Sequence, residues 1–98
     1  MRINFTRRLI EWPGGQVHLT PSESRLLGVF IDNPGRVLSA SEILKSSQGY
    51  EVTQAEASMM LRPLVSRLRH KLAVVPGGEK WIANIRGAGY IYERREKE

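Results

Sequence analysis

Two short stretches of this sequence concentrate cationic side chains in patterns that suit a polyanion. Residues 66–72 read Ser-Arg-Leu-Arg-His-Lys-Leu, and residues 86–90 read Arg-Gly-Ala-Gly-Tyr. In the first stretch cations alternate with leucines, as on a helix that is apolar on one side. In the second, two glycines permit a tight turn that begins with an arginine. A basic helix beside a basic turn can hold a DNA duplex through two neighbouring grooves.

The segment 54–72 separates into distinct faces when its residues are placed about 100° apart. One arc is apolar and is expected to face the core: Leu61, Leu64, Val65, Leu68 and Leu72. The opposite arc is nearly neutral and contains Met59, Pro63, Ser66 and His70. Cations flank this neutral arc, with Arg62 and Arg69 on one side and Arg67 and Lys71 on the other. The flanking cations are placed to reach phosphates while the neutral arc meets base edges.

A run of charge is often only the solvated face of a helix, and such faces usually mix both signs. Here no acidic residue occurs between Ala57 and Val75, which favours the interpretation of 54–72 as a recognition helix. Pro63 lies inside it and removes one backbone hydrogen bond. We expect a bend there with the proline on the exposed side; the alternative is a regular helix that begins near Arg62.

The segments 81–85 and 90–92 alternate like two strands, and residues 86–89 form the turn between them. A narrow tip carrying Arg86 suits a minor groove, whose negative potential attracts a guanidinium. On its own this turn would be interpreted as an ordinary hairpin. Because it follows a basic helix, we interpret it as a second DNA-contacting element. The candidate DNA contacts are Met59, Arg62, Ser66, Arg67, Arg69, His70, Lys71, Asn84 and Arg86.

The elements that must position these residues are predicted by local signals. Residues 1–19 alternate apolar and polar side chains around Pro13-Gly14-Gly15, which predicts a small antiparallel sheet. Three Ser/Thr-x-x-Glu capping boxes predict helix starts, at residues 20–23, 39–42 and 53–56. We therefore predict one α+β domain over 1–98 with a winged helix-turn-helix fold: an N-terminal sheet (1–19), a three-helix core (20–72), a wing hairpin (81–92) and a fraying tail (93–98).

The composition is consistent with this interpretation. The 98 residues include 15 Lys and Arg against 10 Asp and Glu, a net charge of +5 that suits a polyanionic partner. Cysteine is absent, which excludes disulfides and thiolate metal sites, and we expect no metal or cofactor. No apolar run approaches the roughly 20 residues of a membrane span, and the N-terminus lacks a signal peptide. The sequence predicts an intracellular protein without a membrane partner.

Four ordered motifs resemble the effector domain of OmpR/PhoB-type response regulators of bacterial two-component systems. They are Leu-Thr-Pro-Ser-Glu at 19–23, Asn-Pro-Gly-Arg-Val at 33–37, the basic stretch 66–72 and Ile-Arg-Gly-Ala-Gly-Tyr at 85–90. The resemblance covers about residues 3–92. It implies transcription regulation by binding double-stranded DNA in a bacterial cytoplasm, in association with the nucleoid, often as homodimers on direct repeats.

The resemblance also implies roles for particular residues. Arg67 and Arg69 match the recognition-helix arginines, and Arg86 matches the wing arginine that reaches the minor groove. Residues 46–52 match the loop between the second and third helices, which in some members contacts RNA polymerase. The candidate polymerase contacts are Ser46, Ser47, Gln48, Gly49, Tyr50 and Glu51.

The sequence departs from the family pattern at two places. Gln48-Gly49 replaces the tryptophan-glycine pair that helps hold phosphate, and residues 61–65, Leu-Arg-Pro-Leu-Val, replace Val-Asp-Val-His-Ile. The base preference of the family therefore does not carry over. The receiver domain common in the family is absent, so the chain is either an excised effector half or a stand-alone regulator.

A winged helix used for protein contact, with weak or no DNA binding, would explain Pro63, the missing tryptophan and Met59 on the neutral arc. An enzyme is disfavoured, because neither histidine, His18 or His70, neighbours a plausible nucleophile and acid. The glutamates of the three capping boxes already have a structural role.

Overall fold

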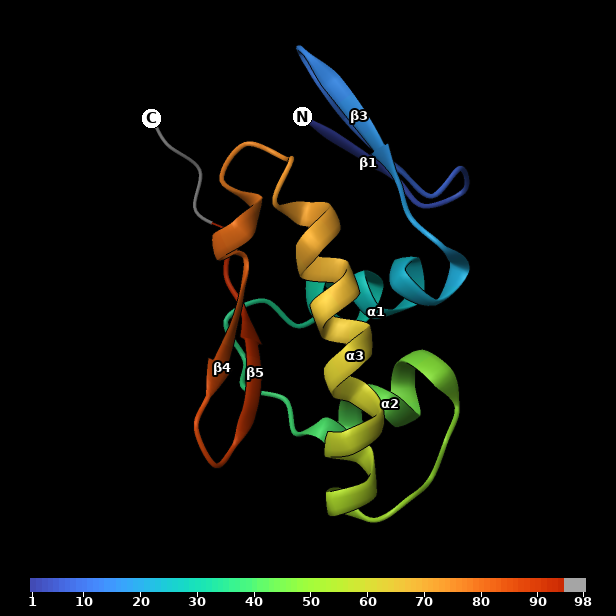
Figure 1. Ribbon diagram of the computed structural model, residues 1–98, viewed down its shortest axis with the longest axis vertical. Helices are drawn as coiled ribbons and strands as arrows, with labels where there is room; N and C mark the ends of the chain where they lie inside the picture. The colour runs from blue at the N-terminus through green and yellow to red at the C-terminus, as the bar shows by residue number, and fades with distance from the viewer. Residues whose placement is uncertain (95–98) are drawn as a thin grey trace.

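The computed structural model describes residues 1–94 and places three helices between two small antiparallel sheets (Figure 1). In chain order the elements are β1 (Arg2–Asn4), β2 (Leu9–Trp12), β3 (Gly15–His18), α1 (Pro21–Ile31), α2 (Ala40–Gln48), α3 (Gln54–Leu72), a 3-10 turn (Gly78–Lys80), β4 (Ile82–Ile85) and β5 (Gly89–Tyr92). The predicted order of sheet, three helices and hairpin is confirmed, and the fold is a winged helix-turn-helix. Of the predicted tail, residues 95–98 lie outside the described part.

The N-terminal sheet has the strand order β1-β2-β3 and forms as the alternation of its residues predicts. Trp12 pairs with Gly15, so the predicted hairpin turn between β2 and β3 contains only Pro13 and Gly14. The Trp12 ring packs directly over Gly15, where an added Cβ would lie 2.8 Å from a ring carbon. This close approach accounts for the glycine. Ile10 on β2 is fully buried and joins the sheet to the helical core.

All three predicted capping boxes are present. At α1 the Glu23 N–H donates to Thr20 Oγ1 at 3.1 Å, and the Thr20 N–H donates back to Glu23 Oε1 at 2.8 Å. Ser39 and Glu42 make the same reciprocal pair at α2, as do Thr53 and Glu56 at α3. Because each pair satisfies two backbone N–H groups that the helix leaves open, these residues fix where the helices begin.

The helix α2 ends where the sequence predicts, near residues 46–49, but the loop that follows it begins later than the family resemblance implies. The helix continues to Gln48 and ends at Gly49, whose φ of 80° is the left-handed conformation that favours glycine. Ser46, Ser47 and Gln48 are therefore helical, and their assignment to the loop before α3 was wrong. The Ser47 hydroxyl donates to the Ile43 carbonyl within the helix, a bond that the four-residue spacing makes available only in helical geometry.

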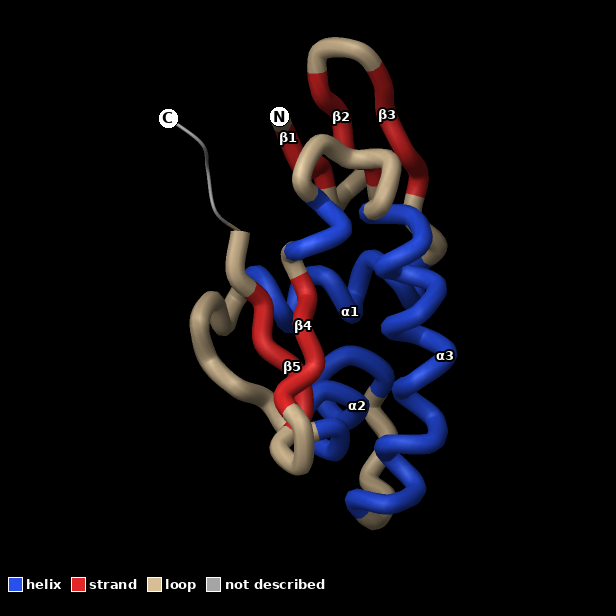
Figure 2. Tube along the Cα trace, turned by 60° about the vertical axis from the view of Figure 1, so that its left-hand side comes forward, coloured by secondary structure: helices blue, strands red, loops and turns tan. Residues whose placement is uncertain are grey.

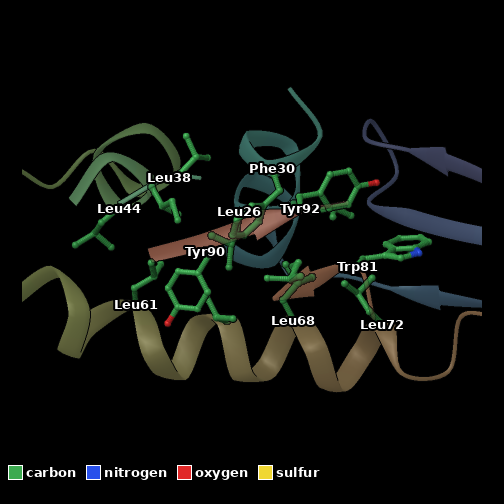
Figure 3. Packing of buried hydrophobic residues seen from close by; sticks show 14 of the residues in the cluster. Leu26, Phe30, Leu38, Leu44, Leu61, Leu68, Leu72, Trp81, Tyr90 and Tyr92 are labelled. Atoms are coloured by element: carbon green, nitrogen blue, oxygen red, sulfur yellow. The ribbon is translucent and has the colours of Figure 1, made fainter. Parts of the chain in front are cut away.

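The predicted core arc of α3 is confirmed. Leu61, Val65, Leu68 and Leu72 are all at most 2% exposed, and Leu64 packs against the edge of the core. Figure 3 shows Leu61, Leu68 and Leu72 directed toward the other buried residues of the core. Two edge-to-face aromatic pairs stabilise that junction: Phe30 with Tyr90 at 6.5 Å and Trp81 with Tyr92 at 6.1 Å between ring centroids.

The hairpin β4–β5, called the wing below, is attached to the body of the domain by its second strand. Leu38 and Tyr90 exchange two backbone hydrogen bonds of 2.8 and 2.9 Å, which adds a single bridge beside β5. Gly89 lies against this bridge, and an added Cβ there would be 2.0 Å from the Leu38 carbonyl oxygen. The wing is thus anchored at its base while its tip, at 86–88, projects beside α3 (Figure 2).

The helix α3 runs without interruption from Gln54 through Pro63 to Leu72. The alternative of a regular helix beginning near Arg62 was therefore wrong. Pro63 is exposed, as expected, and the bend at this position stays a prediction. Within residues 1–94, no helix combines the length and the apolar character needed to cross a membrane.

Candidate nucleic-acid interface

The side of α3 that faces away from the core is open to solvent over most of its length. Met59 is 76% exposed, although its side chain is apolar. The outer side also exposes Arg62, Pro63, Ser66, Arg67 and His70. Five of the nine predicted DNA contacts thus form one continuous surface: Met59, Arg62, Ser66, Arg67 and His70. The helical periodicity of residues 54–72 correctly predicted that these side chains are exposed.

Three exposed arginines on α3 and the wing carry charges that the domain does not neutralise. Among the described residues, the side chains of Arg62, Arg67 and Arg86 have no ion pair or hydrogen bond. A guanidinium has five donors in a fixed fork that fits phosphate oxygens or a guanine edge. Their lack of internal partners leaves all of these donors for an external ligand.

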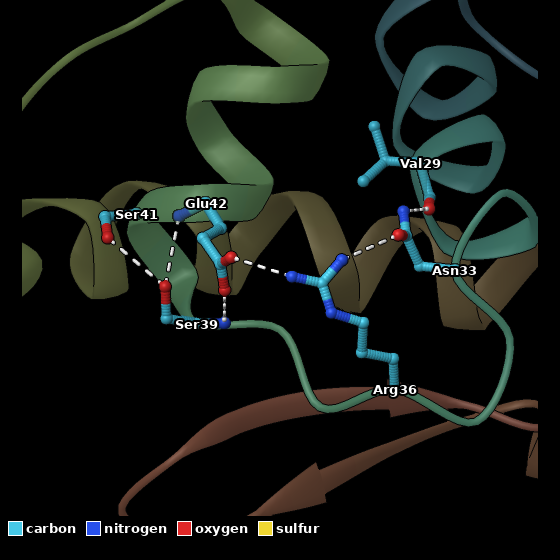
Figure 4. Close-up of polar contacts among 6 residues, drawn as sticks. All are labelled: Val29, Asn33, Arg36, Ser39, Ser41 and Glu42. Carbon is cyan, nitrogen blue, oxygen red and sulfur yellow. Dashed lines mark hydrogen bonds and ion pairs between the residues drawn. The ribbon is translucent and has the colours of Figure 1, made fainter.

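Arg36 shows the opposite situation on the α1–α2 connection. Its guanidinium donates to Asn33 at 3.0 Å and pairs with Glu42 at 3.4 Å, while Asn33 donates to the Val29 carbonyl (Figure 4). The Ser39 N–H bonded to Glu42 lowers the pKa of this carboxyl below its ordinary value of 4.5, with smaller help from the Ser39 hydroxyl and Arg36 against partial burial. Arg36 is therefore engaged within the fold.

Arg69 links α3 to the wing. Its Nε donates to the Ile82 carbonyl at 3.1 Å, its Nη2 donates to the Asn84 side-chain oxygen, and its guanidinium lies 5.8 Å from the centre of the Tyr90 ring. The side chain is half-buried, unlike Arg62 and Arg67. The structure therefore brings two predicted DNA contacts, Arg69 and Asn84, into contact with each other, and their bond holds β4 against α3.

Lys71 lies apart from the other predicted contacts. Its Nζ donates to Glu23 Oε1 at 2.8 Å and to the His18 carbonyl at 2.9 Å, at the start of α1. Burial raises the pKa of Glu23, but the hydrogen bond from Lys71, the bonds from Thr20 and the charge of Lys71 together lower it below 4.5. The charge of Lys71 thus balances a buried carboxylate, and this half-buried residue has a structural partner that sequence spacing did not reveal.

The wing places Asn84 and Arg86 near the N-terminal half of α3. Both residues are exposed, and the tip beyond them turns at Gly87, whose φ is 77°. Figures 1 and 2 both show the tip at the same end of the domain as the start of α3.

The predicted polymerase-contact segment divides into two parts. Ser47 is 3% exposed and Gln48 is bonded to Ser22 and Arg25, so both hold α2 against α1. The connection after Gly49 is exposed, and Tyr50 is 52% exposed. Glu51 pairs with Lys45 at 3.3 Å between side chains that are mostly exposed, a geometry that adds little stability.

Sequence reasoning missed two polar residues of α3 that face the wing. Gln54 and Ser58 line a cleft of about 300 Å³ between α3 and the wing, together with Arg62, Asn84 and Arg86. Gln54, Ser58 and Arg62 are spaced by four residues, so they lie on one helix face. The sequence therefore showed that these three residues share a helix face, but it did not show that this face lies beside the wing.

The family model described as "Transcriptional regulatory protein, C terminal" matches residues 14–92. The transcriptional regulatory protein AruR of Pseudomonas aeruginosa is 37% identical over 86 residues, which are 88% of this chain and 34% of that protein. The chain belongs to this family. The resemblance to OmpR/PhoB-type effector domains is thereby confirmed.

Solved effector domains of this family have the same fold. The DNA-binding domain of Bacillus subtilis CssR has a TM-score of 0.71 at 30% identity, over 93% of this chain and 97% of that one. The DNA-binding domain of the response regulator AdeR, solved in complex with an intercistronic region, has a TM-score of 0.64 at 25% identity, over 82% and 76%. These relatives support a DNA-binding effector domain and not the protein-contact alternative. The chain spans about a third of the length of the curated relatives it matches.

Proposed function

We propose that this effector domain binds double-stranded DNA with α3 in the major groove and the wing tip in the adjacent minor groove, and thereby regulates transcription. The observation that supports this most directly is the set of three exposed arginines without internal partners, Arg62, Arg67 and Arg86, on α3 and the wing. A protein surface that leaves three guanidiniums unpaired has a strong attraction for a polyanion.

The side chains on the outer side of α3 differ in chemistry, and each kind suits a different contact with DNA. Ser66 and His70 offer hydrogen bonds to base edges, and Met59 and Pro63 offer apolar contact to a thymine methyl group. Arg67 supplies either a phosphate contact or a bidentate contact to guanine. Arg86 at the wing enters the minor groove, where a guanidinium is favoured over narrow A·T-rich steps. Arg69 acts mainly by holding the wing in place.

The exposed connection after α2, with Tyr50 at its centre, is the surface we assign to RNA polymerase. Homodimers on direct-repeat DNA are the expected assembly, and the expected location is the bacterial cytoplasm, in association with the nucleoid.

Selection of bound fragments from random duplex DNA, followed by binding titrations, tests the proposal. We expect one or two related half-sites, and an observed affinity that falls steeply as salt rises. The double substitution Arg67→Ala/Arg86→Ala should reduce affinity at least about a hundredfold, since each removes a charge-assisted contact. Arg2→Ala/Arg7→Ala, which removes two cations from the distant N-terminal sheet region, is the matched control. Equal binding by both double variants would contradict the assignment of the interface.

A further inference from the structure

The cleft between α3 and the wing has a chemistry of its own. Its walls carry two guanidiniums, from Arg62 and Arg86, and four uncharged polar side chains, from Gln54, Ser58, Asn84 and Tyr90. Within the described part of the chain, no Asp or Glu lines it. A cleft of about 300 Å³ with two cations and no carboxylate is electrostatically suited to an anion.

The side-chain oxygens of the two amides in the cleft already accept hydrogen bonds from within the protein. Gln54 Oε1 accepts from the Ser41 N–H at 2.9 Å, and Asn84 Oδ1 accepts from Arg69. Each amide therefore keeps its NH₂ group as the end available to a ligand. With the Ser58 hydroxyl and the Arg62 guanidinium, the cleft presents hydrogen-bond donors from both walls. A site that offers donors and positive charge selects an oxyanion with several acceptor oxygens.

DNA geometry identifies which oxyanion reaches this cleft. The major and minor grooves are separated by a single sugar-phosphate strand, which forms a wall of each. If α3 occupies one groove and the wing occupies the next, the strand between them must cross the space between α3 and the wing. That space is the cleft, and its lining faces a phosphodiester rather than a base edge.

We propose that Arg62, with Ser58 and Asn84, binds one phosphodiester of the DNA strand that separates the two occupied grooves. This inference rests on the proposed function and deepens it, because it assigns Arg62 to positioning the domain on the duplex rather than to reading sequence. Arg86, on the opposite wall, directs the wing past the same strand into the minor groove. The site is a clamp around one strand, built from the two elements that Arg69 holds together.

The test is a series of binding titrations at increasing NaCl, on the selected duplex and on a random-sequence duplex. Arg62→Gln is expected to lower the slope of log affinity against log salt by about 0.9 on both duplexes, as expected for the loss of one phosphate contact. Arg62→Lys should retain the slope because it retains the charge. Arg2→Gln, which removes one exposed cation far from the cleft, should leave the slope unchanged.

A methylphosphonate scan locates the phosphate. Neutralising single phosphates of a half-site duplex should weaken wild-type binding by about tenfold at the strand that crosses the cleft, but should not weaken Arg62→Gln further at that position. A slope that Arg62→Gln leaves unchanged would overturn the inference, as would a change confined to the selected duplex, which would indicate base reading. Circular dichroism of each variant confirms that the exposed substitution has not altered the fold.

Two results separate this inference from the proposed function. If the wild-type domain binds neither duplex at low salt, the proposed function itself fails. If it binds with a steep salt dependence that Arg62→Gln does not alter, only the clamp is wrong. Titration with sodium phosphate, followed by NMR at Ser58 and the Asn84 side-chain amide, adds the remaining case: shifts there combined with an unaltered DNA slope would show a free-anion site and overturn the assignment to DNA.

Discussion

The ion pair between Lys71 and Glu23 gives a prediction that separates a structural cation from a DNA-binding one. The Glu23 side chain is 5% exposed and that of Lys71 is 32% exposed. Breaking a fully buried pair by removing one partner costs about 3–5 kcal/mol, because the remaining charge is left uncompensated. Here Thr20 still donates to Glu23, and water reaches the Lys71 side. We therefore expect Lys71→Met to lower the free energy of unfolding by about 2 kcal/mol.

The pH dependence of this loss identifies its source. The pKa of Glu23 is below 4.5 in the folded domain and returns to an ordinary value on unfolding, so its contribution is complete above about pH 4.5. The contribution disappears as the pH falls through the lower folded-state pKa, because the carboxyl is then neutral in both states. The stability difference between the wild type and Lys71→Met should accordingly be full at pH 7 and shrink below pH 4.5.

Urea unfolding followed by circular dichroism at several pH values measures this difference. Lys45→Met is the matched control, since Lys45 pairs with Glu51 at an exposed site and should cost less than about 0.5 kcal/mol. The salt dependence of DNA binding by Lys71→Met, measured where the variant is folded, should match that of the wild type. Unchanged stability together with a slope reduced by about 0.9 would refute the reasoning and make Lys71 a phosphate contact.

Three other substitutions test the framework of the interface. Gly89→Ala should cost about 2–4 kcal/mol in urea unfolding, because its Cβ would meet the Leu38 carbonyl at 2.0 Å, whereas Gly87→Ala, with open space and a φ of 77°, should cost only about 1–2 kcal/mol. Thr53→Ala should cost about 1 kcal/mol and increase amide exchange in the first turn of α3. Arg69→Gln loses the charge and the forked contact with Asn84 and Ile82, so amide exchange in β4 should accelerate while the salt slope stays unchanged; a slope reduced by about 0.9 would contradict a positioning role.

Local signals in the sequence were sufficient for most of the fold. The three capping boxes work through residues three positions apart, and the core arc of α3 follows from helical periodicity alone. The start of the loop after α2 was placed too early because Ser47 and Gln48 are held in the helix by bonds to Ile43, Ser22 and Arg25. Two of those three partners belong to α1, more than twenty residues away, and no local pattern reports them.

The site was predictable to the extent that it depends on one helix. The outer side of α3 could be drawn from the sequence, because exposure there follows from the position of the core arc. The cleft could not, since it exists only where the wing folds back beside Gln54 and Ser58. The bridge between Leu38 and Tyr90 that brings the wing there joins residues 52 positions apart.

The cations of residues 67–71 show why counting the charges in a basic stretch overestimates the number available to bind a ligand. Arg67, Arg69 and Lys71 look equivalent in the sequence, but successive residues on a helix are separated by about 100°, so alternate cations face different neighbours. Arg69 meets the wing and Lys71 meets the buried Glu23, which leaves Arg67 with its donors free. Some cations of α3 make contacts within the domain, and only the others remain available to a ligand. The attraction for DNA therefore depends on the unpaired arginines, and Arg62 contributes to it from outside the basic stretch.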